Sequence, residues 1–197
     1  SRNNHHNTPY DSACFESVGH KWIDASENNY GFAILNDGKY GFGSEENVLS
    51  ISLLKSGSFP FDGASEFIPS FTYSLYPHNG NLTNSDVIEK SYVLNRPLIG
   101  KNICSAEGSE NNYSFVECNN RGVYIDTIKR AMDEDAYVLR LYEGYKENKQ
   151  ITLTFDHDFK ECYVCDLLEN KLESLEIKER EVTLSVKPFE LVTLMVK

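Results

Sequence analysis

Short runs of β-branched and aromatic residues, separated by turn-forming residues, constrain the fold of this chain more than any other feature of its sequence. Most runs alternate between apolar and polar residues, which is typical of half-buried strands. The expected strands are 15–22, 30–35, 48–54, 67–76, 114–118, 123–129, 137–143, 151–155, 162–168, 172–177, 182–186 and 191–196. This pattern predicts an all-β chain built of sandwiches, with one capped helical turn at 85–90.

A polar stretch at residues 100–112, GKNICSAEGSENN, divides the chain by composition. It is nearly free of large apolar residues and rich in residue types that are common in linkers. Before it, long loops space the expected strands irregularly. After it, about seven strands follow one another closely, as in a self-contained sandwich of immunoglobulin size. We therefore expect two domains, 1–111 and 112–197.

The charge balance argues against several classes of partner. The chain has 197 residues, with 19 Lys and Arg against 30 Asp and Glu, and its formal net charge is −11. Because nucleic acids and anionic membranes are bound through basic surfaces, we expect neither as a partner. No apolar run approaches the roughly 20 residues that span a bilayer, and we expect no signal peptide.

The cysteine count and the first residue bear on the compartment and on completeness. Five cysteines are an odd number at low density, which favours an intracellular, reduced protein over a disulfide scaffold. The first residue is Ser and not Met, so we expect that an upstream segment has been removed or that the chain is a piece of a larger protein.

Cys162-x-x-Cys165, preceded by Asp156-His157-Asp158, is the strongest candidate for a metal site. A structural zinc site needs about four nitrogen or sulfur ligands, and no second ligand pair accompanies these cysteines. Residues three apart on a strand also point to opposite faces, so we interpret both as buried or edge cysteines. His20 and His78 have no nucleophile or carboxylate at a spacing typical of a catalytic triad. These motifs predict neither a metal site nor catalytic residues in this chain.

The residues after the apolar strand at 31–35 form the densest group of unusual side chains, Asn36-Asp37-Gly38-Lys39-Tyr40-Gly41-Phe42-Gly43. The segment combines hydrogen-bonding side chains with glycines that let a backbone approach another molecule closely. Two interpretations are open on chemistry alone. The segment is either a β-hairpin turn of the Asp-Gly type or a loop that faces a ligand.

Several stretches, in order along practically the whole chain, resemble the C-terminal region of glycoside hydrolase family 38 α-mannosidases. They are 20–27 (HKWIDASE), 30–41 (YGFAILNDGKYG), 47–55 (NVLSISLLK), 71–80 (FTYSLYPHNG), 91–98 (SYVLNRPL), 138–143 (VLRLYE), 165–169 (CDLLE) and 187–190 (KPFE). The sequence is most similar to the cytosolic or vacuolar branch, which trims free mannose oligosaccharides and carries no signal peptide.

The resemblance implies a fold, an activity and partners. The fold would be the distal part of a β-supersandwich, followed by a small Ig-like β-sandwich. The activity would be that of a zinc-dependent retaining enzyme that hydrolyses terminal α-mannosides of oligosaccharides. In the family, the carboxylate nucleophile and the His and Asp zinc ligands lie in an N-terminal α/β domain, so this chain alone should bind no zinc and be inactive. Its expected partners are that catalytic domain and a mannose-containing oligosaccharide, in the cytoplasm or vacuole, and an oligomer of the full-length enzyme is compatible with the resemblance.

The resemblance also implies a role for the loop at 36–41, because the corresponding loop of the family approaches the mouth of the catalytic cleft. The candidate substrate-cleft residues are Asn36, Asp37, Lys39 and Tyr40. The sequence departs from the family pattern at two places. Residues 56–70 contain no His, and Asn81-Leu82 follow Gly80 where the family often has a bulky residue.

Two other functions are compatible with an all-β chain of this composition. A stand-alone carbohydrate-binding module should present a planar aromatic platform and bind mannosides by itself. An Ig-like structural or adhesion domain should carry paired cysteines and a secretion signal. An upstream α/β segment with His and Asp zinc ligands would distinguish the mannosidase interpretation from both.

Overall fold

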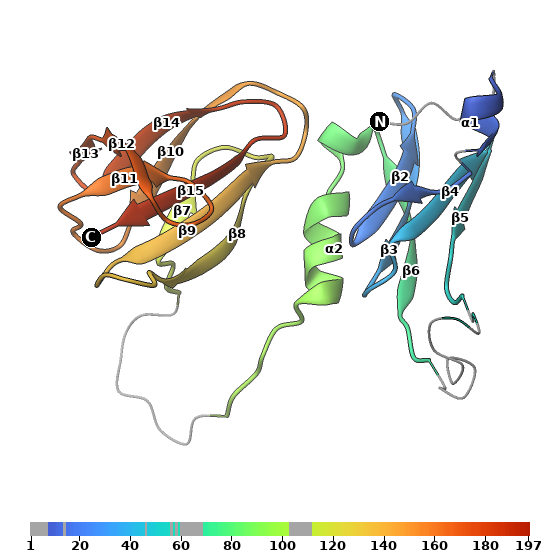
Figure 1. Ribbon diagram of the computed structural model, residues 1–197, viewed down its shortest axis with the longest axis horizontal. Coiled ribbons are helices and arrows are strands. Elements are labelled where there is room, and N and C mark those ends of the chain that lie inside the picture. The colour runs from blue at the N-terminus through green and yellow to red at the C-terminus, as the bar shows by residue number, and fades with distance from the viewer. Residues whose placement is uncertain are drawn as a thin grey trace. The chain divides into compact units, whose positions relative to one another are not determined.

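The computed structural model describes residues 8–13, 15–45, 47–55, 57, 59, 69–102 and 112–197. It comprises two compact units, an N-terminal unit of Ser1–Ile103 and a C-terminal unit of Cys104–Lys197 (Figure 1). Residues 103–111 lie outside the described part of the chain, so the expected domain boundary between 111 and 112 remains a prediction.

Strands dominate both units, and the prediction of an all-β chain is confirmed. Helical structure among the described residues consists of α1 (Pro9–Ala13), the 3-10 turn η2 (Leu82–Asn84) and α2 (Val87–Asn95). None of these helices is long and apolar enough to cross a membrane.

The N-terminal unit contains two antiparallel three-stranded sheets. The first has the order β2–β3–β6, with β2 at Trp22–Ser26, β3 at Tyr30–Asn36 and β6 at Tyr73–Asn79. The second has the order β1–β4–β5, with β1 at Ser17–Val18, β4 at Gly41–Glu45 and β5 at Val48–Ile51.

Helix α2 covers one face of the β2–β3–β6 sheet. Val87 packs in a buried cluster with Ala33 and Leu35 of β3, and Leu94 packs against the same cluster. The sequence predicts only a helical turn at 85–90, and that prediction is too short because Leu94 gives the helix a second apolar contact about two turns after Val87. Helix α1 is not predicted from the sequence at all.

The face that α2 covers also carries a buried histidine–aspartate pair. Nε2 of His78 on β6 lies 2.8 Å from Oδ1 of Asp24 on β2, and the two side chains are only 4% and 3% exposed. Gly31 of the central strand lies opposite His78 in the register. A β-carbon at Gly31 would come within 2.1 Å of Cε1 of His78, so the imidazole occupies space that only glycine leaves free. The pair joins the two outer strands across the middle one.

We predict that Gly31→Ala destabilises the chain by roughly 1–3 kcal/mol, because the added methyl group overlaps a buried ring that has no room to move. Urea denaturation of the 197-residue chain measures this change. Gly100→Ala is the matched control, since a β-carbon there meets nothing within 4 Å. Equal stability of the two variants would show that the His78 ring is not confined.

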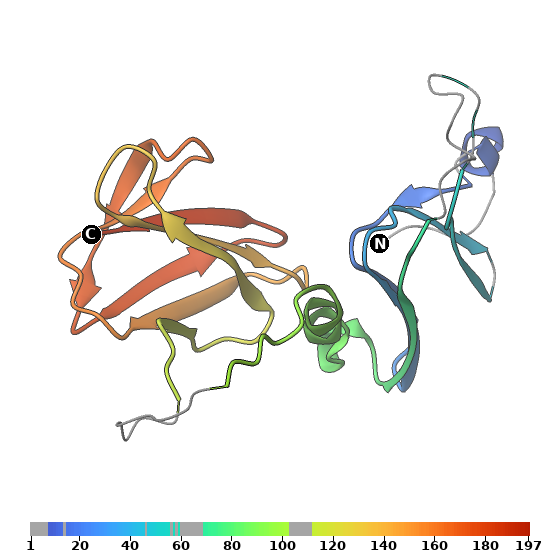
Figure 2. The same ribbon diagram turned by 90° about the horizontal axis from the view of Figure 1, so that it is seen from below.

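The C-terminal unit is a sandwich of two antiparallel sheets (Figures 1 and 2). The four-stranded sheet has the order β13–β14–β10–β7, with β7 at Val116–Cys118, β10 at Lys149–Phe155, β13 at Ile177–Lys178 and β14 at Glu181–Val186. The five-stranded sheet has the order β12–β11–β15–β9–β8, with β8 at Val123–Arg130, β9 at Tyr137–Glu143, β11 at Cys162–Cys165, β12 at Lys171–Leu175 and β15 at Leu191–Val196.

Strict alternation along the strands builds the core of this sandwich. On β10, Ile151, Leu153 and Phe155 are buried, whereas the intervening Thr152 and Thr154 form hydrogen bonds with side chains of β14 on the outer face. The facing strands of the five-stranded sheet contribute the other half of the same buried cluster. Burial of roughly 1.5–3 kcal/mol per large apolar side chain is the main source of its stability.

The structure corrects several expected strand limits. The expected strand at 15–22 is split between β1 and β2, and the one at 172–177 is split between β12 and β13. The expected strand at 162–168 ends at Cys165, because the next residues form a turn held by Asp166. Residues 41–45 form strand β4, although Gly41 and Gly43 have the composition of a loop.

Candidate functional site

The loop that joins β3 to β4 passes from one sheet of the N-terminal unit to the other. Strand β3 is the centre of the β2–β3–β6 sheet, whereas β4 is the centre of the β1–β4–β5 sheet. The two strands are not paired with each other, so the interpretation of residues 36–43 as a β-hairpin turn is wrong. A crossover of this kind needs other contacts to fix its shape.

Asn36 supplies most of these contacts. Its side-chain Oδ1 accepts hydrogen bonds from the backbone N–H groups of Gly38 and Lys39, at 3.0 and 2.6 Å. Its backbone N–H donates to the carbonyl of Lys21, and its own carbonyl accepts from Nδ2 of Asn95 on α2. The residue is completely buried, and its Nδ2 has no partner among the described residues. Asn36 therefore fixes the conformation of the loop, and it exposes no atoms to solvent in this chain.

Asp37 ties the loop to the start of β6. Its Oδ1 accepts a hydrogen bond of 2.9 Å from the backbone N–H of Thr72, and its own N–H donates to the Thr72 carbonyl. The hydrogen bonds from Thr72 hold the pKa of the Asp37 carboxyl below its usual value, with a smaller contribution from the charge of Lys39. Asp37 therefore stays ionised at neutral pH while its side chain is exposed to solvent.

Lys39 and Tyr40 face aromatic rings from distant parts of the sequence. The amino group of Lys39 lies 5.0 Å from the centre of the Phe71 ring, in a cation–π contact. The ring of Tyr40 stacks on His20 with centroids 5.4 Å apart and an interplanar angle of 13°. Tyr40 is 55% exposed, so one side of this stacked pair is available to solvent.

The four candidate residues lie at the end of β3 and in the loop that follows it, and the structure gives each a partner or a ring neighbour that the sequence does not predict. Phe71 and Thr72 precede β6, and Asn95 ends α2. Their only signal in the sequence is that the polar loop at 36–43 and the stretch at 71–80 are both unusually rich in aromatic and polar residues. Chemically, the loop offers hydrogen-bonding groups and an exposed ring, which are the groups that bind sugars.

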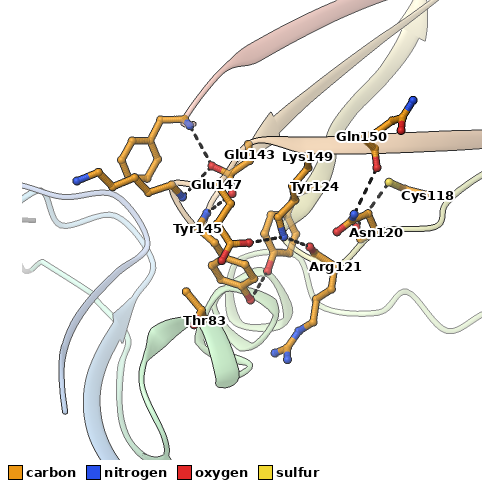
Figure 3. Close-up of polar contacts among 12 residues, drawn as sticks. Thr83, Cys118, Asn120, Arg121, Tyr124, Glu143, Tyr145, Glu147, Lys149 and Gln150 are labelled. Atoms are coloured by element: carbon orange, nitrogen blue, oxygen red, sulfur yellow. Dashed lines mark hydrogen bonds and ion pairs between the residues drawn. The ribbon is translucent and has the colours of Figure 1, made fainter. Parts of the chain in front are cut away.

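A second polar centre lies at one end of the C-terminal sandwich (Figure 3). Glu143 at the end of β9 is 1% exposed, and its carboxylate accepts hydrogen bonds from three backbone N–H groups. The donors are Tyr145 at 2.7 Å, Lys146 at 2.8 Å and Phe189 at 3.0 Å. Lys146 and Phe189 have φ values of 65° and 57°, which are unfavourable for residues other than glycine. Glu143 therefore fixes two turns, the one after β9 and the one before β15.

Aromatic and cationic side chains extend this centre (Figure 3). The hydroxyl of Tyr124 donates to that of Tyr145 at 2.9 Å, and the two rings are perpendicular. Lys149 donates to the carbonyl of Arg121, pairs with Glu147 at 3.2 Å and lies 5.3 Å from the Tyr145 ring. These groups contact one another or the backbone of the same unit. We therefore interpret the cluster as one that stabilises the end of the sandwich.

We predict that Glu143→Ala lowers the free energy of unfolding by roughly 2–4 kcal/mol, because it leaves three turn N–H groups without their acceptor. Chemical denaturation followed by circular dichroism measures the loss. Glu176→Ala is the control, since that side chain is 74% exposed and pairs with the equally exposed Lys178. Should the two variants be equally stable, the turns would have to be held by other contacts.

The two cysteines of the Cys-x-x-Cys motif do not converge. Cys162 belongs to the core between the sheets, whereas Cys165 belongs to a small separate cluster with Val138 and Met195. Burial raises the pKa of the Cys162 thiol to about 12, and burial also raises the pKa of Cys165. Within the described ranges, no group of three or more His, Cys, Asp or Glu side chains is placed to hold a metal ion. These residues do not fit a zinc site.

The fold and the loop define an all-β region made of two sheet-rich units. Residues 122–194 match the C-terminal beta sandwich domain of glycosyl hydrolases family 38, and residues 1–62 match the C-terminal domain of the same family. The chain belongs to the C-terminal region of glycosyl hydrolase family 38, as the resemblance of its sequence predicts.

Individual relatives agree with this assignment. The chain is 36% identical over 197 residues to alpha-mannosidase G of Dictyostelium discoideum and 33% identical over 199 residues to alpha-mannosidase 2C1 of Homo sapiens. Each match covers 98% of this chain but only 18% and 19% of the relative, so the chain spans about a fifth of their length. A solved α-mannosidase from Enterococcus faecalis V583 shares the fold, with a TM-score of 0.72 and 16% identity, over 92% of this chain and 21% of that one.

Proposed function

We propose that this chain is the non-catalytic C-terminal β region of an α-mannosidase that hydrolyses terminal α-mannosides of oligosaccharides. The observation that carries the proposal is the match of 98% of the chain to proteins named alpha-mannosidase, in which it corresponds to only 18–19% of their length. The nucleophile and the metal-binding residues then belong to an N-terminal catalytic domain, which is the main partner of this region.

In this proposal, zinc is bound by the N-terminal catalytic domain and not by this chain. The resemblance implies a retaining mechanism with a zinc ion that orients the sugar, but the described residues of this chain do not fit a metal site. Their contribution is to hold a shaped surface next to the catalytic domain. The free thiols of Cys118, Cys162 and Cys165 support the cytoplasm as the proposed location, because unpaired cysteines are typical of reducing compartments.

The β3–β4 loop is the part of this surface that we propose to contact substrate. Tyr40 presents an exposed ring face and a hydroxyl, Lys39 supplies donors, and ionised Asp37 supplies an acceptor. Buried Asn36 would act by fixing the backbone on which these side chains stand. A loop that is held in one conformation before it meets a sugar loses little entropy on binding.

The isolated 197-residue chain should hydrolyse no aryl α-mannoside, with or without added zinc, whereas the full-length protein should hydrolyse it. The reason is that the catalytic groups lie outside this chain, and a heat-treated sample gives the background rate. Turnover by the isolated chain above that background would contradict the assignment to a non-catalytic region. Failure of the full-length protein to act on α-mannosides would contradict the proposed activity.

The exposed aromatic rings of the N-terminal unit favour one alternative function, a stand-alone carbohydrate-binding module. Tyr30, Tyr40 and Tyr73 are 58%, 55% and 51% exposed. Titration calorimetry of the isolated chain with a mannose oligosaccharide distinguishes the alternatives. Binding by the isolated chain supports the module, whereas a wall of a composite cleft should show no binding without the catalytic domain.

In the full-length enzyme, Asp37→Ala should lower kcat/KM by about 10- to 100-fold, because the loop loses its tie to Thr72 and positions substrate less well. Asp158→Ala is the matched control, with an 81% exposed carboxylate in the other unit. Steady-state kinetics, with melting temperature and zinc content as checks, measure the effect. A less stable variant with unchanged kinetics would show that the loop only connects two sheets.

A further inference from the structure

Two turns of the C-terminal unit expose a group of large apolar side chains. Met132, in the turn between β8 and β9, is 86% exposed. Leu167 and Leu168, in the turn between β11 and β12, are 57% and 83% exposed. Single exposed apolar residues are common on proteins, but three on adjoining turns form a patch. We call Met132, Leu167 and Leu168 the two-turn patch.

Glu169 brings the two turns together. One of its carboxylate oxygens accepts a 2.9 Å hydrogen bond from the backbone N–H of Met132, and the other pairs with Lys129 on β8. The hydrogen bond from Lys129 and that from Met132 hold the pKa of Glu169 below its usual value. Arg140 on β9 adds a second link, a 3.2 Å hydrogen bond to the carbonyl of Leu167. The patch is therefore a product of tertiary contacts between two hairpins.

Asp166 fixes the conformation in which the leucines are presented. Its Oδ1 accepts hydrogen bonds of 2.9 Å from the N–H groups of both Leu168 and Asn170, and its Oδ2 accepts one of 2.8 Å from the Asn170 side chain. These bonds lower the pKa of Asp166, so the carboxylate is ionised at neutral pH. A turn that is this well fixed presents its apolar side chains at a small entropic cost on binding.

Three ion pairs lie around the patch. Arg130 pairs with Asp135 at 3.1 Å, and Lys171 pairs with Glu134 at 2.8 Å. Lys129 is paired with Glu169, as described above. Because these pairs reduce the charge around the patch, it suits an apolar partner surface better than a strongly charged one.

We propose that the two-turn patch is the surface through which the C-terminal unit docks on the part of the same polypeptide that precedes this chain in the full-length enzyme. This inference rests on the proposed function. The occupant would be an apolar surface of that preceding part, and Leu168 would be the central anchor because it is the most exposed leucine of the patch.

The size of the patch favours this occupant over a second copy of the chain. Three side chains provide far less than the roughly 800 Å² per partner that a standard interface between separate proteins buries. Within one polypeptide, the effective concentration of the partner is high, and a small contact is sufficient for docking. About four fifths of the relatives' length lies outside the region that matches this chain, which leaves ample surface for the contact.

Hydrogen–deuterium exchange tests the proposal directly. Peptides that cover 131–136 and 166–170 are compared in the 197-residue chain and in the full-length protein, and we expect exchange at least about 10-fold slower in the full-length protein. Equal exchange in the two proteins would overturn the proposal. So would protection in the 197-residue chain that increases with its concentration, because that result would identify a second copy as the occupant.

Substitution of Leu168 provides the energetic test. Leu168→Ser should leave the melting temperature of the 197-residue chain unchanged and lower that of the full-length protein by about 2–4 °C. Leu191→Ser is the matched control, a 50% exposed leucine of β15 that pairs with Tyr142 and lies outside both turns, and it should have no such differential effect. Equal shifts for Leu168→Ser in both proteins would overturn the proposal. The α-mannosidase activity of the wild-type protein is measured separately, so failure of docking and failure of the proposed function are distinguishable.

Discussion

Side-chain oxygen atoms that accept backbone N–H groups fix the turns on which both units depend. A sheet satisfies the backbone groups inside its strands, but the turns and crossovers between strands leave several N–H groups without a ladder partner. Asn36 fills this need at the β3–β4 crossover, Glu143 at the two turns next to β9 and β15, and Asp166 after β11. In each case one carboxylate or amide fixes the backbone conformation of several residues. A single substitution therefore leaves several backbone N–H groups without an acceptor.

The same constraint shapes the candidate substrate surface. Because Asn36 is completely buried and holds the loop backbone, the positions of Lys39 and Tyr40 are determined before any ligand arrives. Thr72 then links the loop to β6, whose register is anchored at its other end by the pair of His78 with Asp24. A shift in the register of β6 would move every side chain of the strand. The pair at one end of β6 therefore also fixes the position of the loop that is bonded at the other end.

How much of this was predictable depends on whether the signal is local. Strands β9 and β15 are predicted to the residue, since their apolar, aromatic and β-branched content favours a strand. Strand β4 is missed because Gly41 and Gly43 have turn composition, and only its pairing with β1 and β5 makes it a strand. The loop with the four candidate residues is marked by its composition and by the family resemblance, but their partners, such as Thr72 and His20, follow from tertiary contacts that no local pattern reveals.

Buried carboxylates in a chain related to glycosidases invite assignment as catalytic groups, and their hydrogen bonds argue against it here. A carboxylate that attacks a sugar needs an oxygen that is free to form the new bond, and a proton donor needs access to the leaving oxygen. Both oxygens of Glu143 already accept backbone N–H groups, and Asp24 is bonded to His78 beneath α2. Each of these carboxylates is used to hold strands or turns together. Under the proposed function, the contribution of this region is therefore a fixed surface, and the chemistry comes from the proposed catalytic domain.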